Sequence, residues 1–191
     1  MECRMMPISG MKKRESEDGK IYLEGYFAKF NEPYVVFDDW VETIRPGAFT
    51  NYLKKGKDVK ILWNHNADIV LGSTAAGTAE LEEDNLGLYG MVEINKNDTD
   101  AMNAYARVLR GDVSGCSFGF DIKELDEKID DDGVYRTELI EIDPLYEVSP
   151  CTFPAYESTS IDARSRERID NLRKRKLNRW KEEMHKKLKG E

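Results

Sequence analysis

Short apolar runs, separated by turn-forming residues, occupy most of this chain and limit the folds open to it. The runs are rich in β-branched and aromatic side chains, and Gly, Pro, Asn or Asp residues stand between them. They predict about seven short strands without regular strand–helix alternation, which favours a barrel or sandwich over a parallel sheet. The runs cover residues 20–30 with a continuation at 34–37, then 59–63, 69–72, 86–94, 113–122, 135–142 and 147–153.

Two helices are predicted among these strands. Residues 48–55 have helical composition and end at Gly56, which suits one or two turns. The second helix begins with Asp98 or Thr99 as its N-cap, has apolar side chains at three- and four-residue spacing, and stops at Gly111. The expected fold is therefore mainly β (α+β) with a few helices.

Charge divides the chain into an acidic body and a basic tail. The net charge is −8, but residues 163–191 hold 12 Lys and Arg against 5 Asp and Glu, a surplus of +7. The preceding residues hold 17 basic and 32 acidic side chains, a net charge of −15. Apolar tail residues gather on one helical arc. We predict a polar leader over residues 1–19, one domain over 20–162 and a basic amphipathic helical tail over 163–191.

Composition also restricts location and partners. No apolar run approaches the roughly 18 to 20 residues of a membrane span, and the first residues lack the apolar stretch of a signal peptide, so a cytoplasmic protein without membrane contact is expected. The acidic body argues against nucleic-acid binding, for which only the tail is suited. Cys3, Cys116 and Cys151 share no metal-ligand spacing and are expected as reduced thiols.

Of the two histidines, His65 is the better candidate for acid–base chemistry. It follows the apolar run 59–63, and a strand end fixes the backbone while the next loop leaves a ring nitrogen accessible. A hydrogen-bonded loop histidine is the plain alternative. His185 lies among Lys and Glu residues in the tail and is expected to be a surface residue.

A candidate nucleophile lies in the glycine-rich segment 111–120. Small residues surround Ser117, and glycines there let a substrate or backbone amides approach the hydroxyl. Strand alternation puts Gly115, Ser117 and Gly119 on one face, opposite Ser114, Cys116 and Phe118. A tight strand crossing is the structural alternative, and Ser114 and Cys116 are neighbouring candidates.

Glu147 is a charged residue embedded in an apolar segment near the end of the body. A partly buried carboxylate requires a partner. It could orient His65 as the third member of a catalytic triad, or form a salt bridge with a Lys or Arg.

Taken together, these segments resemble the prohead serine proteases of tailed bacteriophages, which are related to the assembly proteases of herpesviruses. The resemblance covers residues 25–155. By similarity, His65 matches the catalytic histidine and Ser117 the nucleophile. The herpesvirus relatives use a second histidine as third member, but the other histidine of this chain, His185, lies in a tail that lacks family motifs. Glu147 is therefore the candidate for that role, with Asp143 and Glu141 as reserves. The motifs are Glu42-Thr-Ile-Arg-Pro-Gly-Ala-Phe49, Leu62-Trp-Asn-His65, Gly87-Leu88, Gly111 with Ser117-Phe-Gly-Phe120, and Glu147-Val-Ser149 with Pro154-Ala155.

The resemblance implies a closed, mostly antiparallel β-barrel ringed by a few helices. It further implies a serine endopeptidase inside the prohead, in the host bacterial cytoplasm, which cleaves the scaffolding segment of the major capsid protein or a scaffold protein, and then itself. No cofactor and no metal are implied. A homodimer, as in the herpesvirus relatives, is left open. We also expect the basic tail to dock the enzyme onto acidic scaffold or capsid segments, with packing on the body or on a second copy as the alternative.

Three other functions remain as alternatives. The chain could be an inactive capsid-assembly or scaffolding protein of the same fold, against which the presence of both His65 and Ser117 speaks. A cysteine hydrolase using Cys116 with His65 is chemically reasonable, but the face predicted for Cys116 is opposite that of Ser117. A module that binds nucleic acid through its basic tail is the third.

Overall fold

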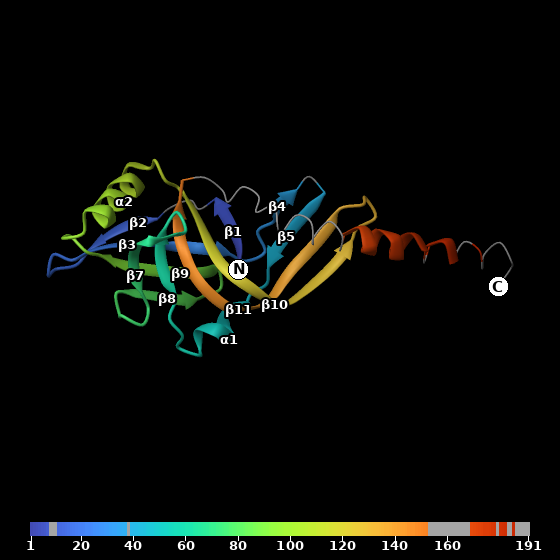
Figure 1. The fold of residues 1–191 in the computed structure, drawn as a ribbon, viewed down its shortest axis with the longest axis horizontal. Coiled ribbons are helices and arrows are strands. Elements are labelled where there is room, and N and C mark those ends of the chain that lie inside the picture. The colour runs from blue at the N-terminus through green and yellow to red at the C-terminus, as the bar shows by residue number, and fades with distance from the viewer. Residues whose placement is uncertain (8–10, 38, 153–168, 179, 183–184, 186–191) are drawn as a thin grey trace.

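The computed structural model describes residues 1–191 apart from 8–10, 38, 153–168, 179, 183–184 and 186–191. The described residues form eleven strands and two short helices in the body, followed by a helical segment in the tail (Figure 1). The strands are β1 (Glu2–Pro7), β2 (Lys12–Glu15), β3 (Ile21–Lys29), β4 (Tyr34–Phe37), β5 (Trp40–Ile44), β6 (Lys60–Trp63), β7 (Asn66–Ser73), β8 (Ala79–Glu83), β9 (Gly87–Ile94), β10 (Gly115–Ile129) and β11 (Tyr135–Cys151), and the helices are α1 (Thr50–Leu53) and α2 (Thr99–Arg110).

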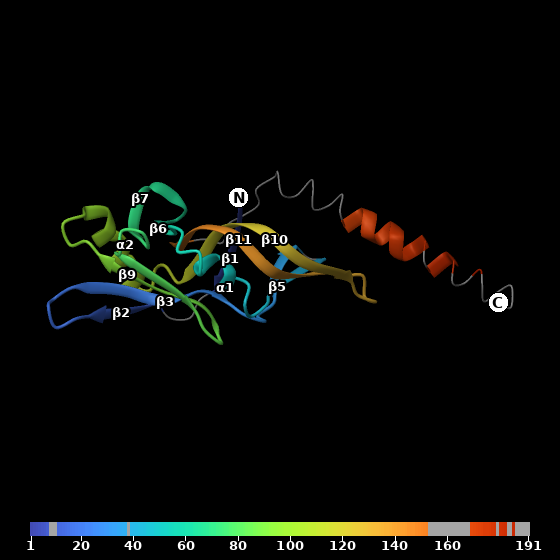
Figure 2. The ribbon, with the colours of Figure 1, turned by 90° about the horizontal axis from the view of Figure 1, so that it is seen from below.

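The strands form two sheets that pack as layers (Figure 2). The larger sheet has the order β1-β10-β11-β5-β4, and the β6–β7 hairpin joins it through β6 and β11. The smaller sheet is antiparallel, with the order β2-β3-β9-β8. One hydrophobic core lies between the layers and includes Phe27 and Leu88 from the smaller sheet and Phe118 and Val148 from the larger.

The mainly β class is confirmed, but the expected closed barrel is wrong. Within the described ranges both sheets are open, and β11 pairs in parallel with β5 near its start and with β6 near its end. Register shifts between Gly119 and Leu125 of β10 separate these two regions, and such irregularities bend a sheet. The two ends of the long β10–β11 hairpin therefore diverge, each with its own partner strand, and the sheet edges do not meet.

Local signals placed α2 correctly. The Asp98 carboxylate accepts hydrogen bonds from the backbone N–H groups of Asp100 (2.9 Å) and Ala101 (3.2 Å), and Gly111 ends the helix with φ 85°. The other helix, α1, is shorter than the expected 48–55.

The sequence pattern did not reveal four strands, two of which lie in the expected polar leader. β2 reads Lys-Lys-Arg-Glu and is fully exposed, so it lacks the apolar alternation of a strand with one buried face. In β1, Arg4 is buried and pairs with buried Glu42 of β5. Its Nε contacts Glu42 Oε1, and its Nη2 lies 3.3 Å from Oε2. Thr137 of β11 also donates to Glu42, at 3.2 Å. Polar contacts thus hold β1 in the sheet.

The helical segment of the tail packs against the body at the far end of the β10–β11 hairpin, as Figure 1 shows. Ile169 is buried in a cluster with Trp40 and Tyr135. Arg173 pairs with Asp39 (2.7 Å), and the Lys176 ammonium donates to the carbonyl of Ile129 (3.1 Å). No helix in the described part of the chain is long and apolar enough to span a membrane.

Candidate active site

The turn between β6 and β7 places His65. Trp63 pairs with Asn66 across the hairpin, and the two residues between them, Asn64 and His65, have φ of 52° and 60°. Two consecutive residues of positive φ are the signature of a type I′ turn, in which glycine is preferred at the second position. A histidine there is held in the left-handed region at a conformational cost, and such strain is often found at functional sites.

Hydrogen bonds fasten this turn to the end of β11. The backbone N–H of Asn64 donates to the carbonyl of Pro150 (3.1 Å), and the Asn64 side chain accepts from the backbone of Thr152 (2.8 Å). The backbone N–H of His65 donates to Ser149 Oγ (3.2 Å). The histidine is therefore positioned by β11 as well as by its own hairpin.

His65 and Glu147 lie side by side. His65 Nδ1 is 2.6 Å from Glu147 Oε1, and Glu147 is 4% exposed. A carboxylate only accepts hydrogen bonds, so Nδ1 carries a proton, and in the neutral ring Nε2 is the nitrogen with the lone pair. Nε2 is buried and has no hydrogen-bond partner within the described part of the chain. This tautomer suits a general base.

Ser149 joins the other two residues. Its hydroxyl donates to Glu147 Oε2 and accepts from the backbone N–H of His65. Gly119 lies opposite Glu147 on β10, where a Cβ would stand 2.6 Å from Glu147 Oε1. Glycine at this position therefore leaves the space that the carboxylate occupies.

Ser117 shares a face of the sheet with these groups. It is paired with Ser149 in the β10–β11 register, and Gly119 is paired with Glu147, so their side chains point to the same side. Ser117 is fully buried, and its Oγ has no hydrogen-bond partner. Ser117 Oγ and His65 Nε2 are the two buried side-chain N or O atoms of the described residues that lack one.

The competing candidates lie elsewhere. Cys116 packs in the core on the opposite face, as the alternation predicted, and burial raises the pKa of its thiol well above the ordinary value. Ser114 is exposed before β10 begins, and His185 is exposed in the tail. Among the reserves, Asp143 pairs with Lys55 (2.5 Å), and Glu141 pairs with Lys123 (2.8 Å).

Cys3 is a site residue that the sequence did not reveal. It lies on β1 opposite Gly119, and Cys3, His65 and Glu147 each place one ligand atom within 4.8 Å of the other two. Burial raises the pKa of the Cys3 thiol. Finding this residue required the pairing of β1 with β10, for which the polar sequence of the first residues carried no signal.

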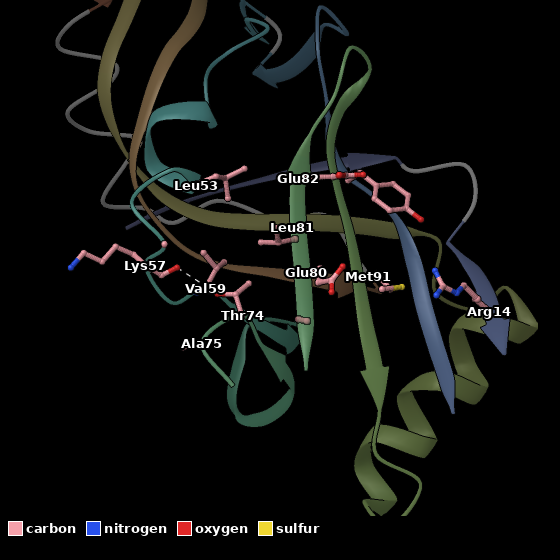
Figure 3. Close-up of a pocket in the computed structure, with 13 residues that line it drawn as sticks. Arg14, Leu53, Lys57, Val59, Thr74, Ala75, Glu80, Leu81, Glu82 and Met91 are labelled. Carbon is pink, nitrogen blue, oxygen red and sulfur yellow. Dashed lines mark hydrogen bonds between the residues drawn. The ribbon is translucent and has the colours of Figure 1, made fainter. Parts of the chain in front are cut away.

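A cavity of about 550 Å³ lies away from this constellation (Figure 3). Its walls combine apolar side chains such as Leu53 and Met91 with the charged Arg14 and Glu80. None of His65, Ser117 and Glu147 lines it. The chemistry of the candidate site is therefore separate from this hollow.

Comparison with known proteins gives three similarities. The family model described as caudovirus prohead serine protease matches residues 9–175. The prohead protease of Enterobacteria phage HK97 is 32% identical over 161 residues, which cover 82% of this chain and 66% of that protein, just under two thirds of its length. The solved structure of the bacteriophage T4 capsid assembly protease, gp21, aligns with a TM-score of 0.41 and 10% identity, over 78% of this chain and 99% of that one.

Proposed function

This chain belongs to the caudovirus prohead serine protease family, and we propose that it is a serine endopeptidase with Ser117 as nucleophile, His65 as general base and Glu147 as the residue that orients the histidine. One observation carries this proposal. His65 Nδ1 is held by Glu147 at 2.6 Å, while its Nε2 and the hydroxyl of Ser117 are both buried without partners. A base, its orienting carboxylate and a hydroxyl are the elements of a serine-protease triad.

The chemistry follows from these protonation states. His65 Nε2 takes the proton of Ser117 as Oγ attacks the peptide carbonyl carbon, and Glu147 stabilises the imidazolium that forms. The imidazolium then protonates the amine, the C–N bond breaks, and an acyl-enzyme ester remains. Water, deprotonated by His65, hydrolyses the ester and restores Ser117. Because Ser117 is fully buried, the residues around it must move before a substrate can reach its hydroxyl.

The substrate proposed is the scaffolding segment of the major capsid protein, or a separate scaffold protein, inside the prohead in the host cytoplasm. The similarity to the HK97 protein, which is named a prohead protease, supports this choice. We also propose that the enzyme cleaves itself. A homodimer is the oligomeric state to test first. No nucleic acid or cofactor takes part in the proposed reaction.

Co-expression with the cognate capsid protein tests this function. Wild type, Ser117→Ala and the control Ser114→Ala, which changes an exposed serine of the same segment, are compared by intact mass of capsid protein and enzyme. Wild type and Ser114→Ala should produce the same fragments, and Ser117→Ala none. Fragments from Ser117→Ala would exclude this nucleophile, and uncut proheads with all three would support an inactive assembly protein.

A further inference from the structure

We propose that Cys3, His65 and Glu147 form a binding site for a thiophilic divalent cation of the zinc type, and that the bound ion reversibly inhibits the peptidase. The three residues come from β1, the β6–β7 turn and β11, and their ligand atoms lie mutually within 4.8 Å. The inhibition rests on the proposed function, whereas the binding of the ion does not.

The donor set matches this class of ion. Thiolate, imidazole and carboxylate are the three ligand types that proteins use for zinc, and a fourth position can hold water. With bonds of about 2.0 to 2.3 Å, ligand atoms of a tetrahedral site lie about 3.3 to 3.8 Å apart. A separation at the 4.8 Å limit would need to contract by about 1 to 1.5 Å, and His65 Nδ1 and Glu147 Oε1, now 2.6 Å apart, would need to move slightly apart.

The surroundings of the cluster also favour a ligand. Ser117 is fully buried on the same face, and neither its Oγ nor His65 Nε2 has a hydrogen-bond partner in the described residues. A metal-bound water would supply the hydrogen bonds that Ser117 lacks. The buried Arg4–Glu42 pair holds β1 in the sheet, and so keeps Cys3 beside the histidine.

Binding would remove the general base. The ion takes a lone pair of the His65 imidazole, so the ring can no longer accept the proton of Ser117. The ion also binds Glu147, so the hydrogen bond that orients the ring is lost. Removal of the ion restores both groups, which makes the inhibition reversible.

Cobalt(II) provides a test of binding that does not depend on activity, because thiolate coordination produces a near-ultraviolet charge-transfer band. The full chain carrying Ser117→Ala, which prevents self-cleavage, is titrated with Co²⁺ and followed by absorbance. One equivalent should produce the band, and adding Cys3→Ser or His65→Ala should abolish it. Adding Cys116→Ala, a change on the opposite face, should leave it. Circular dichroism verifies that each variant is folded. A band that survives Cys3→Ser, or no band at all, would overturn the site.

The inhibition is tested with Zn²⁺ on the active enzyme. Wild type should lose cleavage at micromolar Zn²⁺ and recover it with EDTA, whereas Cys3→Ser, compared with its own rate without Zn²⁺, should require at least tenfold more Zn²⁺ for the same fractional loss. Equal inhibition of both would overturn the inhibitory role. If wild type never cleaves but the Ser117→Ala chain binds Co²⁺ through Cys3, the proposed function fails while the metal site stands.

Discussion

Ser117 and Ser149 lie directly opposite each other on β10 and β11, with their side chains on one face of the sheet. Ser149 is fully buried, and its hydroxyl bridges Glu147 and the backbone of His65. The strand pairing thus places the proposed nucleophile beside the residue that holds its base and the orienting carboxylate together. Ser149 is therefore a positioning residue in this scheme.

Ser149→Ala should lower kcat with little change in KM. It leaves Glu147 Oε2 and the His65 N–H without this partner, at a cost of about 1–3 kcal/mol. If the free energy of the transition state rises by this amount, the rate falls about 5- to 150-fold. Kinetics on a peptide spanning a mapped cleavage site measure the effect, and the Nδ1 proton signal of His65 in NMR reports ring orientation. Ser149→Thr, which keeps the hydroxyl, should restore much of both. An unchanged Nδ1 signal and kcat in Ser149→Ala would contradict the role.

Glu147→Gln should reduce kcat by about 10²- to 10⁴-fold, because an amide can present its NH₂ group to Nδ1 and favour the wrong tautomer of His65. Peptide hydrolysis measures this loss. Asp143→Asn, at a carboxylate that pairs with Lys55 instead, is the matched control and should cleave at the wild-type rate. Equal losses in both variants would point to a general charge effect.

Replacement of His65 should separate turn stability from chemistry. Both His65→Ala and His65→Gly remove the ring, but φ of 60° favours glycine, so His65→Gly should be more stable than His65→Ala by about 1 kcal/mol. Urea unfolding measures the difference. Both should be inactive, and added imidazole should partly restore cleavage by His65→Gly by occupying the vacated space. If the two variants unfold alike, the positive φ carries no cost.

Breaking the buried Arg4–Glu42 pair should destabilise the protein strongly. Arg4 is 5% exposed and Glu42 is 2% exposed, so Glu42→Gln leaves a buried cation without its main partner, at a cost of about 3–5 kcal/mol. Denaturant unfolding measures this loss. The double variant Arg4→Met with Glu42→Leu removes both charges and should recover most of the stability. No recovery would show that the hydrogen bond that Glu42 accepts from Thr137 matters more than the ion pair.

Truncation after Arg164 tests the tail. The first helical turns pack on the body through Ile169, while Leu177 and Trp180 remain 49% and 56% exposed among basic residues. We expect these exposed residues to dock on acidic scaffold or capsid segments, so the truncated enzyme should be absent from purified proheads. Gel analysis of those particles measures its incorporation. Unchanged incorporation and self-processing would refute the docking role.

Features that depend on local geometry could be read from the sequence. Side chains alternate along any strand, so Ser117 and Cys116 could be assigned to opposite faces before the partners of β10 were known. Asp98 and Gly111 could be predicted as the two ends of α2, because capping satisfies backbone groups within one turn. The His-Ser-Glu constellation was predicted through family similarity, and its roles await the experiments above.

Contacts between distant segments were decided by the tertiary structure. The sequence favoured Glu147 and kept Asp143 and Glu141 as reserves, but it held no contact for any of them. The β6–β11 pairing brings Glu147 to His65, while the other two meet Lys55 and Lys123. The tertiary structure also decided that the two sheets stay open instead of closing into a barrel, and that Cys3 lies beside His65 and Glu147. Strand pairing joins backbone groups of any sequence, so register and partner follow from how the whole core packs, whereas alternation and caps need only their neighbours.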